Sequence, residues 1–146
     1  MDEPPLPAAL CCDSDRGCVF AKALLSHTAS CALAQRRAVA ERVLVECPSP
    51  VSRTNCSTLR ALMHERARFA LRLSGPGRPL MHMQALRLQC GGLVAMQQVL
   101  ASPDRDVHAM VGAAQQRHGS LTELPWETLV PALVAWQPAR RGRARE

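Results

Sequence analysis

The chain has 146 residues, 47% of them hydrophobic and 3% aromatic, and its net charge of +6 arises from seventeen arginines and one lysine against twelve acids. This length predicts one domain with a core that needs no disulfide staples. The near absence of aromatic residues argues against folds that stack nucleic-acid bases on aromatic side chains. No apolar run approaches the roughly 20 residues of a membrane-spanning helix, and the proline-rich, acidic first ten residues do not resemble an export signal. We therefore expect a cytoplasmic protein without membrane contact.

The first part of the chain is predicted to be a lead-in followed by short elements. Residues 1–14 contain prolines and acids with nothing periodic to bury, which predicts disorder. A short helix follows from about residue 15 to 26, and a turn spans 27–30. The segment from Ala38 to Cys47 is ambiguous. Its alternating valines allow a short strand, but residues 32–42 could also form a helix. We expect a short helix there and then an extended piece, near Val39 to Cys47.

A long helix is predicted after the proline loop that follows Cys47. Thr54 or Asn55 caps this helix, which reaches about Leu73 and ends at the glycine- and proline-containing segment 74–79. The next helical stretch, from Leu80, is expected to bend or break where two glycines, at 91 and 92, are adjacent.

The C-terminal part shows clearer helix signals. Ser102, Pro103 and Asp104 predict the start of a helix that stops at Gly119. A capping box over 120–123 and a last helix over 126–136, kinked at Pro131, follow. The arginine-rich residues 138–146 are expected to form a basic tail.

Together these elements predict an all-α fold, a single small domain of four to six short helices over residues 15–137 with at most one short extended segment. Roughly twenty large apolar side chains are available to its core, each contributing about 1.5 to 3 kcal/mol when fully buried. A metal is therefore not required for folding.

Seven cysteines in a chain without an export signal point to metal or redox chemistry, because cytosolic thiols stay reduced. Four lie at predicted turns or element ends, and we interpret them as the metal-ligand and cofactor-binding set: Cys31, Cys47, Cys56 and Cys90. Cys56 is expected at a helix start, where the dipole lowers a thiol pKa, and Cys90 precedes the two glycines. Cys18 is an alternative to Cys31, and Cys11 and Cys12 are interpreted as incidental.

Four thiolates suit an iron–sulfur cluster or zinc. The spacings of fifteen, eight and thirty-three intervening residues match neither paired zinc knuckles nor ferredoxin runs. Isolated cysteines on separate elements favour a cluster held between helices. Buried structural thiols, with no cofactor, remain the alternative interpretation.

Other side chains carry weaker signals. His82 lies two turns before Cys90 and is a possible further ligand, although a surface role is favoured. Arg60, Arg68 and Arg72 form a stripe on the long helix together with His64. Such a stripe is usually a solvated face, but it would suit an acidic protein or, less well, a phosphate backbone. Glycine-rich phosphate loops, nucleophile elbows and paired-histidine zinc motifs are absent from the sequence, so no catalytic residue is assigned, and any enzyme activity would have to come from a bound cofactor or a lone thiol.

The segments ERARFALRL at 65–73 and LMHMQALRLQCGGL at 80–93 resemble a group of small helical, cysteine-containing proteobacterial proteins. The resemblance covers about half of the chain. It implies a bacterial, cytosolic origin and supplies no activity or functional residue.

The sequence predicts a small iron–sulfur protein for electron transfer or redox sensing, which docks an acidic redox partner on its arginine stripe. The alternative is a metal-free or zinc-bound helical module that binds an acidic protein or nucleic acid through this basic face. A third possibility is a sensor in which two cysteines form a reversible disulfide.

Overall fold

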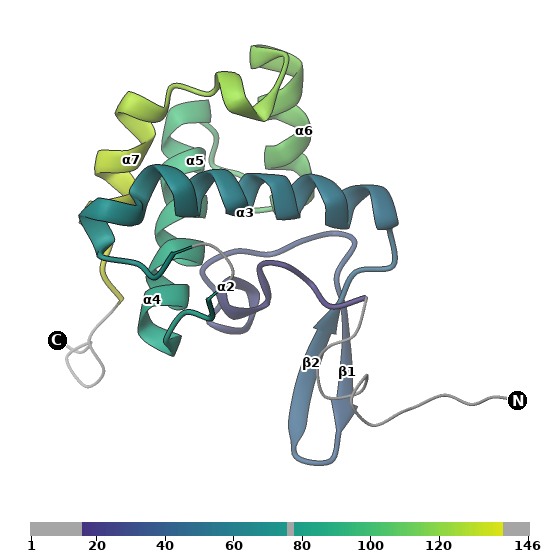
Figure 1. Ribbon diagram of the computed structural model, residues 1–146. Coiled ribbons are helices and arrows are strands. Elements are labelled where there is room, and N and C mark those ends of the chain that lie inside the picture. The colour runs from purple at the N-terminus through teal and green to yellow at the C-terminus, as the bar shows by residue number, and fades with distance from the viewer. Residues whose placement is uncertain (1–15, 76–77, 139–146) are drawn as a thin grey trace, which may run out of the picture.

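The computed structural model describes residues 16–75 and 78–138, which form a mainly helical body with a projecting β-hairpin (Figure 1). The helices are α2 (Ala21–Leu25), α3 (Pro50–Leu71), α4 (His82–Leu86), α5 (Gly92–Leu100), α6 (Val107–His118) and α7 (Trp126–Ala135), with a π-helical turn η1 (Arg87–Gly91) and a 3₁₀ turn η2 (Leu121–Glu123). The predicted lead-in, the incidental Cys11 and Cys12, and all but one residue of the basic tail lie outside the described residues.

The hairpin consists of β1 (Gln35–Val39) and β2 (Arg42–Glu46), which pair in antiparallel register from Gln35 opposite Glu46 to Val39 opposite Arg42. The fold is therefore mostly helical, as predicted, but not purely all-α. The short helix expected over residues 32–42 is wrong, because β1 occupies that segment. Every residue of β1 is exposed, so it carries no alternating apolar pattern from which a strand could be recognised.

The long helix α3 begins at Pro50, earlier than the predicted start at Thr54 or Asn55. Proline is suited to the first helical position because a backbone N–H there has no hydrogen-bond partner within the helix, so its absence costs nothing. The preceding Ser49 is the N-cap, and its hydroxyl accepts a hydrogen bond from the Ser52 amide at 3.1 Å. Cys56 consequently lies inside the second turn of α3, away from the helix start.

The glycines at 91 and 92 do not break the helix: α4, η1 and α5 follow one another without interruption from His82 to Leu100. They permit close packing instead. A Cβ atom added at Gly91 would lie 2.6 Å from the carbonyl oxygen of Leu133 on α7, and one added at Gly92 would overlap the Met63 sulfur on α3. The expected bend is wrong because the absence of side chains here serves contacts between helices.

Helix α6 starts at Val107, with Asp106 at the N-cap position, four residues after the predicted Pro103. The Ser102 hydroxyl does accept a hydrogen bond from the Asp104 amide at 3.1 Å. This bond stabilises a turn that precedes α6 and does not cap the helix. The end at Gly119 is confirmed by the positive φ of 83° of that glycine. The last helix, α7, contains Pro131 as predicted.

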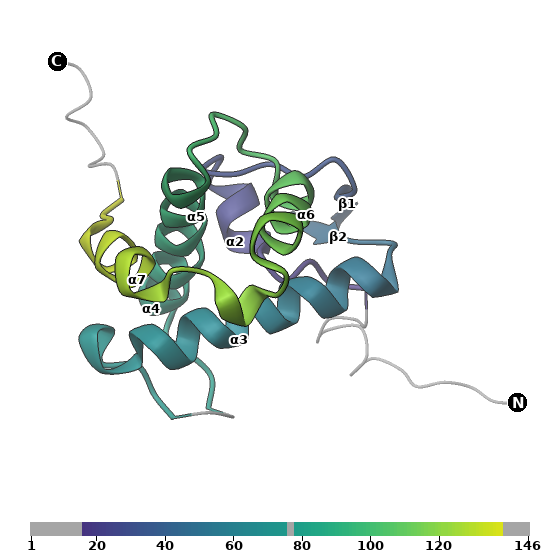
Figure 2. The same ribbon diagram turned by 90° about the horizontal axis from the view of Figure 1, so that it is seen from above.

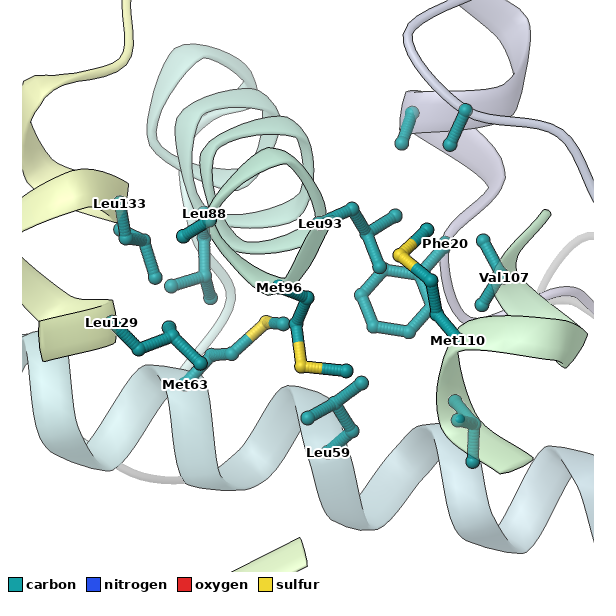
Figure 3. Close-up of a cluster of buried hydrophobic side chains, with 14 of the residues drawn as sticks. Phe20, Leu59, Met63, Leu88, Leu93, Met96, Val107, Met110, Leu129 and Leu133 are labelled. Carbon is teal, nitrogen blue, oxygen red and sulfur yellow. The ribbon is translucent and has the colours of Figure 1, made fainter. Parts of the chain in front are cut away.

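The core is formed where α3 crosses α5, α6 and α7 (Figures 1 and 2). Figure 3 shows Met63 of α3 and Met96 of α5 side by side near Leu129 of α7, while Phe20, just before α2, reaches between Leu93 and Met110. All of these side chains are buried. Within the described residues, none of the helices combines the length and the apolar character needed to cross a membrane.

Candidate functional site

A pocket of about 110 Å³ on the α2 and hairpin side of α3 is lined by four cysteines from four different segments. They are Cys18, Cys31, Cys47 and Cys56. Phe20, Leu33, Val107 and Val111 supply much of the remaining wall, which makes the pocket largely apolar. The described cysteines are free thiols.

Cys18 and Cys47 are brought together by backbone pairing across the base of the hairpin. The Cys18 amide donates to the Val45 carbonyl at 2.9 Å, and the Cys47 amide donates to the Arg16 carbonyl at 2.7 Å. Residues 16–18 thus run antiparallel to the end of β2, in a bridge centred on Gly17 and Glu46. Because both cysteines lie within this bridged region, the hairpin fixes their relative position.

Cys31 is positioned by the start of α6. The Ser30 amide donates to Arg105, and the Ser30 carbonyl accepts from the Val107 amide at 2.7 Å. On the other side of Cys31, the Ala32 amide donates to the Asp106 carboxylate at 2.8 Å. These bonds hold the Cys31 loop on both sides against a helix that is distant in sequence.

Cys56 comes from α3, on the side of the helix that faces this loop and α6. Arg53, one turn earlier, also lines the pocket, and its guanidinium donates a short hydrogen bond to the Cys47 carbonyl. The arginine therefore links the start of α3 to the end of β2. It also brings a fixed positive charge to the pocket.

Two thiols of this pocket, those of Cys18 and Cys56, are difficult to ionise. Burial raises the pKa of Cys18 from 9.0 to about 11, and the neighbouring Cys31 and Cys47 add to the rise. Burial likewise raises the pKa of Cys56 to about 12, with further contributions from Cys18, Cys31 and Cys47. At these two positions a thiolate is disfavoured both by burial against the apolar walls and by the like charges that neighbouring thiolates would carry.

The four side chains surround a space and do not meet at one point. Among the described residues, no group of three or more Cys, His, Asp or Glu side chains is arranged to hold a metal ion as it stands. Binding at this pocket would therefore require the thiols to change rotamer, and cysteine side chains have three staggered positions about one bond for doing so.

Three of the four predicted ligands line the pocket, and the fourth does not. Cys90 lies on η1, fully buried in the helical core, and its sulfur is 3.4 Å from the Ser26 hydroxyl. Cys18, considered in the sequence only as a substitute for Cys31, lines the pocket beside it. The sequence argument for Cys90 depended on a helix break that the structure lacks.

The argument for Cys56 is also corrected. Its position in the second turn of α3 removes the expected lowering of its pKa by free amides at a helix start, and burial raises that pKa instead.

His108 is the pocket residue that sequence reasoning missed. It lies on α6 beside Val107 and Val111, and the same helix contributes Gly112 and Gln115 to the lining. Their spacing along one helix face was the available signal. His82 is elsewhere: its Nδ1 accepts from the Lys22 ammonium at 3.0 Å.

No protein-family model, curated protein or solved structure matches this chain significantly.

Proposed function

We propose that this protein binds an iron–sulfur cluster through Cys18, Cys31, Cys47 and Cys56 and uses it to transfer electrons or to sense redox state in a bacterial cytoplasm. The observation that carries the proposal is the gathering of four free thiols, from four separate segments, around one pocket. Soft thiolate ligands in fours are the usual ligands of such clusters. Cys18 takes the place that the sequence analysis gave to Cys90.

The size of the pocket favours a cluster. A volume of about 110 Å³ is several times the roughly 10–15 Å³ that one water occupies on this measure. It is also well below the roughly 300 Å³ at which pockets for organic ligands begin. The volume of an iron–sulfur cluster, which contains several iron and sulfide ions, lies between these two limits.

The electrostatics of the pocket also favour a cationic occupant. The neighbouring thiols add to the raised pKa of Cys18 and of Cys56, and only Arg53 among the lining residues carries a permanent positive charge. Iron ions would replace the thiol protons and neutralise the thiolates that form. The apolar walls, including Phe20 and Val111, would restrict solvent and thereby influence the reduction potential.

The first test is metal and sulfide analysis. Protein purified without oxygen, or reconstituted with ferrous iron and sulfide, should contain both elements and absorb visible light. Protein that takes up neither would overturn the proposal, and zinc without sulfide would identify a zinc site instead. A defined disulfide between two pocket cysteines after peroxide treatment of iron-free protein would support a thiol sensor.

The second test separates the two possible ligand sets. Cys18→Ser should abolish or strongly reduce the iron and sulfide per chain, whereas Cys90→Ala should leave them unchanged. Circular dichroism checks that both variants are folded. The reverse result, loss with Cys90→Ala and retention with Cys18→Ser, would contradict the proposed ligand set.

A further inference from the structure

A second and larger cleft lies beside residues 60–68 of α3. It is bounded by this helix, by α2 and by the segment that leads into α4. Its volume is about 950 Å³, near the upper end of the roughly 300–1,000 Å³ range of ligand pockets. Its lining has an unusual charge balance: Lys22, Arg60, His64, Arg68 and Arg78 against the single acid Glu65.

The basic side chains converge from three segments. Arg60, His64 and Arg68 recur every four residues along α3 and so share one helix face. Lys22 comes from α2, and Arg78 from the connection between α3 and α4. None of the ion pairs formed among the described residues involves a cation of this cleft.

Two of these groups are held by hydrogen bonds that leave them able to meet a ligand. His64 donates from Nε2 to the Ser74 carbonyl at 2.9 Å, which ties the end of α3 to the residues after it. Lys22 donates one of its three hydrogens to His82. The cleft thus presents positive charge that its own structure does not neutralise.

The remainder of the lining is largely aliphatic. It includes Ala61, Pro79, Leu80, Ala85 and Leu88. An aliphatic lining offers nothing to a sugar–phosphate backbone, and no phenylalanine, tyrosine or tryptophan lines the cleft to stack on a base. A ligand that uses the whole surface combines carboxylates with aliphatic groups.

We propose that this cleft is a docking site for a partner-protein segment in which acidic and aliphatic side chains are interspersed. The carboxylates lie against Arg60, Arg68 and Arg78, and the aliphatic side chains cover Leu80 and its neighbours. This proposal goes beyond the iron–sulfur site and does not depend on it, because none of the four pocket cysteines lines the cleft.

The charge part of the proposal is tested with a fluorescein-labelled peptide of alternating glutamate and leucine, by fluorescence anisotropy at low and moderate salt. Arg60→Glu should weaken binding about tenfold or more. The matched control is Arg42→Glu on β2, also exposed, which changes the net charge equally but lies outside the cleft. Equal losses in both variants, or no peptide binding by the unmodified protein, would overturn the proposal.

The aliphatic part needs its own comparison. Leu80→Ala should weaken binding of the glutamate–leucine peptide but leave binding of an all-glutamate peptide of equal length unchanged. A thymidine oligonucleotide of matched charge is the competing ligand. If the oligonucleotide binds more tightly than the peptide, and its binding is lost in the Arg60→Glu variant, the cleft is a nucleic-acid site and the proposal is wrong.

Discussion

At the scale of single residues, the thiols of Cys18 and Cys56 line the same pocket and both resist ionisation. With pKa values of about 11 for Cys18 and about 12 for Cys56, both groups are neutral at physiological pH in the iron-free protein. Neutral thiols are weak nucleophiles, so neither residue suits a catalytic or peroxide-reactive role. The proposed cluster must displace their protons, and its uptake should therefore decline as the pH falls.

The same raised pKa values predict that iron-free protein loses stability in alkali. Unfolded thiols ionise near pH 9.0, whereas Cys18 and Cys56 in the folded protein ionise near 11 and 12. Between pH 9.0 and about 12 the unfolded state binds fewer protons, so the free energy of unfolding decreases as the pH rises. Apart from thiols, the chain offers little else that titrates there, because it has no tyrosine and one lysine.

Urea unfolding of reduced, iron-free protein across this pH range measures the effect. Cys56→Ser removes one of the two groups and should make the decrease shallower. A decrease of equal size in the variant would show that Cys56 does not ionise with a raised pKa.

The residues of the site could be predicted from the sequence only in part. The positions of Cys31, Cys47 and Cys56 near predicted turns and element ends indicate them as ligands, and the structure brings all three to one pocket. The sequence does not distinguish Cys18 from Cys31 as a ligand, because the position of Cys18 depends on pairing between residues 16–18 and the distant β2. His108 shares a helix face with Gly112 and Gln115, but which face of α6 meets the pocket depends on tertiary packing.

At the scale of elements, the predictable parts are those with local signals. Gly119 with its positive φ ends α6, and the apolar stripes of α3 and α7 bury Leu59, Met63 and Leu129. The hairpin could not be recognised from β1, since all of its residues are exposed. The glycine pair at 91 and 92 was misinterpreted because propensity alone does not reveal which helices lie against a glycine.

The structural interpretation of the glycine pair predicts that Gly91→Ala destabilises the protein. Its new methyl group would meet the Leu133 backbone, which cannot rotate away, and the Trp136 Cβ at 3.2 Å. Overpacking of this kind costs about 1–3 kcal/mol. The measurement is the free energy of unfolding of iron-free protein in urea.

Gly112→Ala provides the matched control. Gly112 also lies inside a helix, α6, but a Cβ atom added there would have no neighbouring atom within 4 Å. Alanine there should stabilise the protein by about 0.5–1 kcal/mol, because glycine loses more backbone entropy on folding. Stabilisation by both substitutions would show that α7 does not pack closely on Gly91.

At the scale of the whole molecule, three of the four pocket cysteines and the packing of α5 and α7 on α3 draw on different parts of the chain. Cys18, Cys31 and Cys47 belong to the non-helical segments that surround α2 and the hairpin, and only Cys56 belongs to a long helix. The core contacts of Met63, Met96 and Leu129 lie among α3, α5 and α7 (Figure 3). The two regions meet along α3 and at Phe20, which lines the pocket and also belongs to the core.

This division predicts a partial response to removal of the proposed cluster. Ligand binding stabilises the segments that form the site, so chelation of iron should increase amide hydrogen exchange mainly within residues 16–47. The amides of α5 and α7 should remain protected, because buried apolar side chains hold those helices together without the pocket. Hydrogen exchange followed by mass spectrometry, on loaded and chelated protein, measures both regions at once. The Cys56→Ser variant, which lacks one ligand, should resemble the chelated protein before any chelator is added. Collapse of the far-ultraviolet dichroism on chelation would show instead that the cluster is required for the entire fold, and unchanged exchange over residues 16–47 would show that the pocket does not hold it.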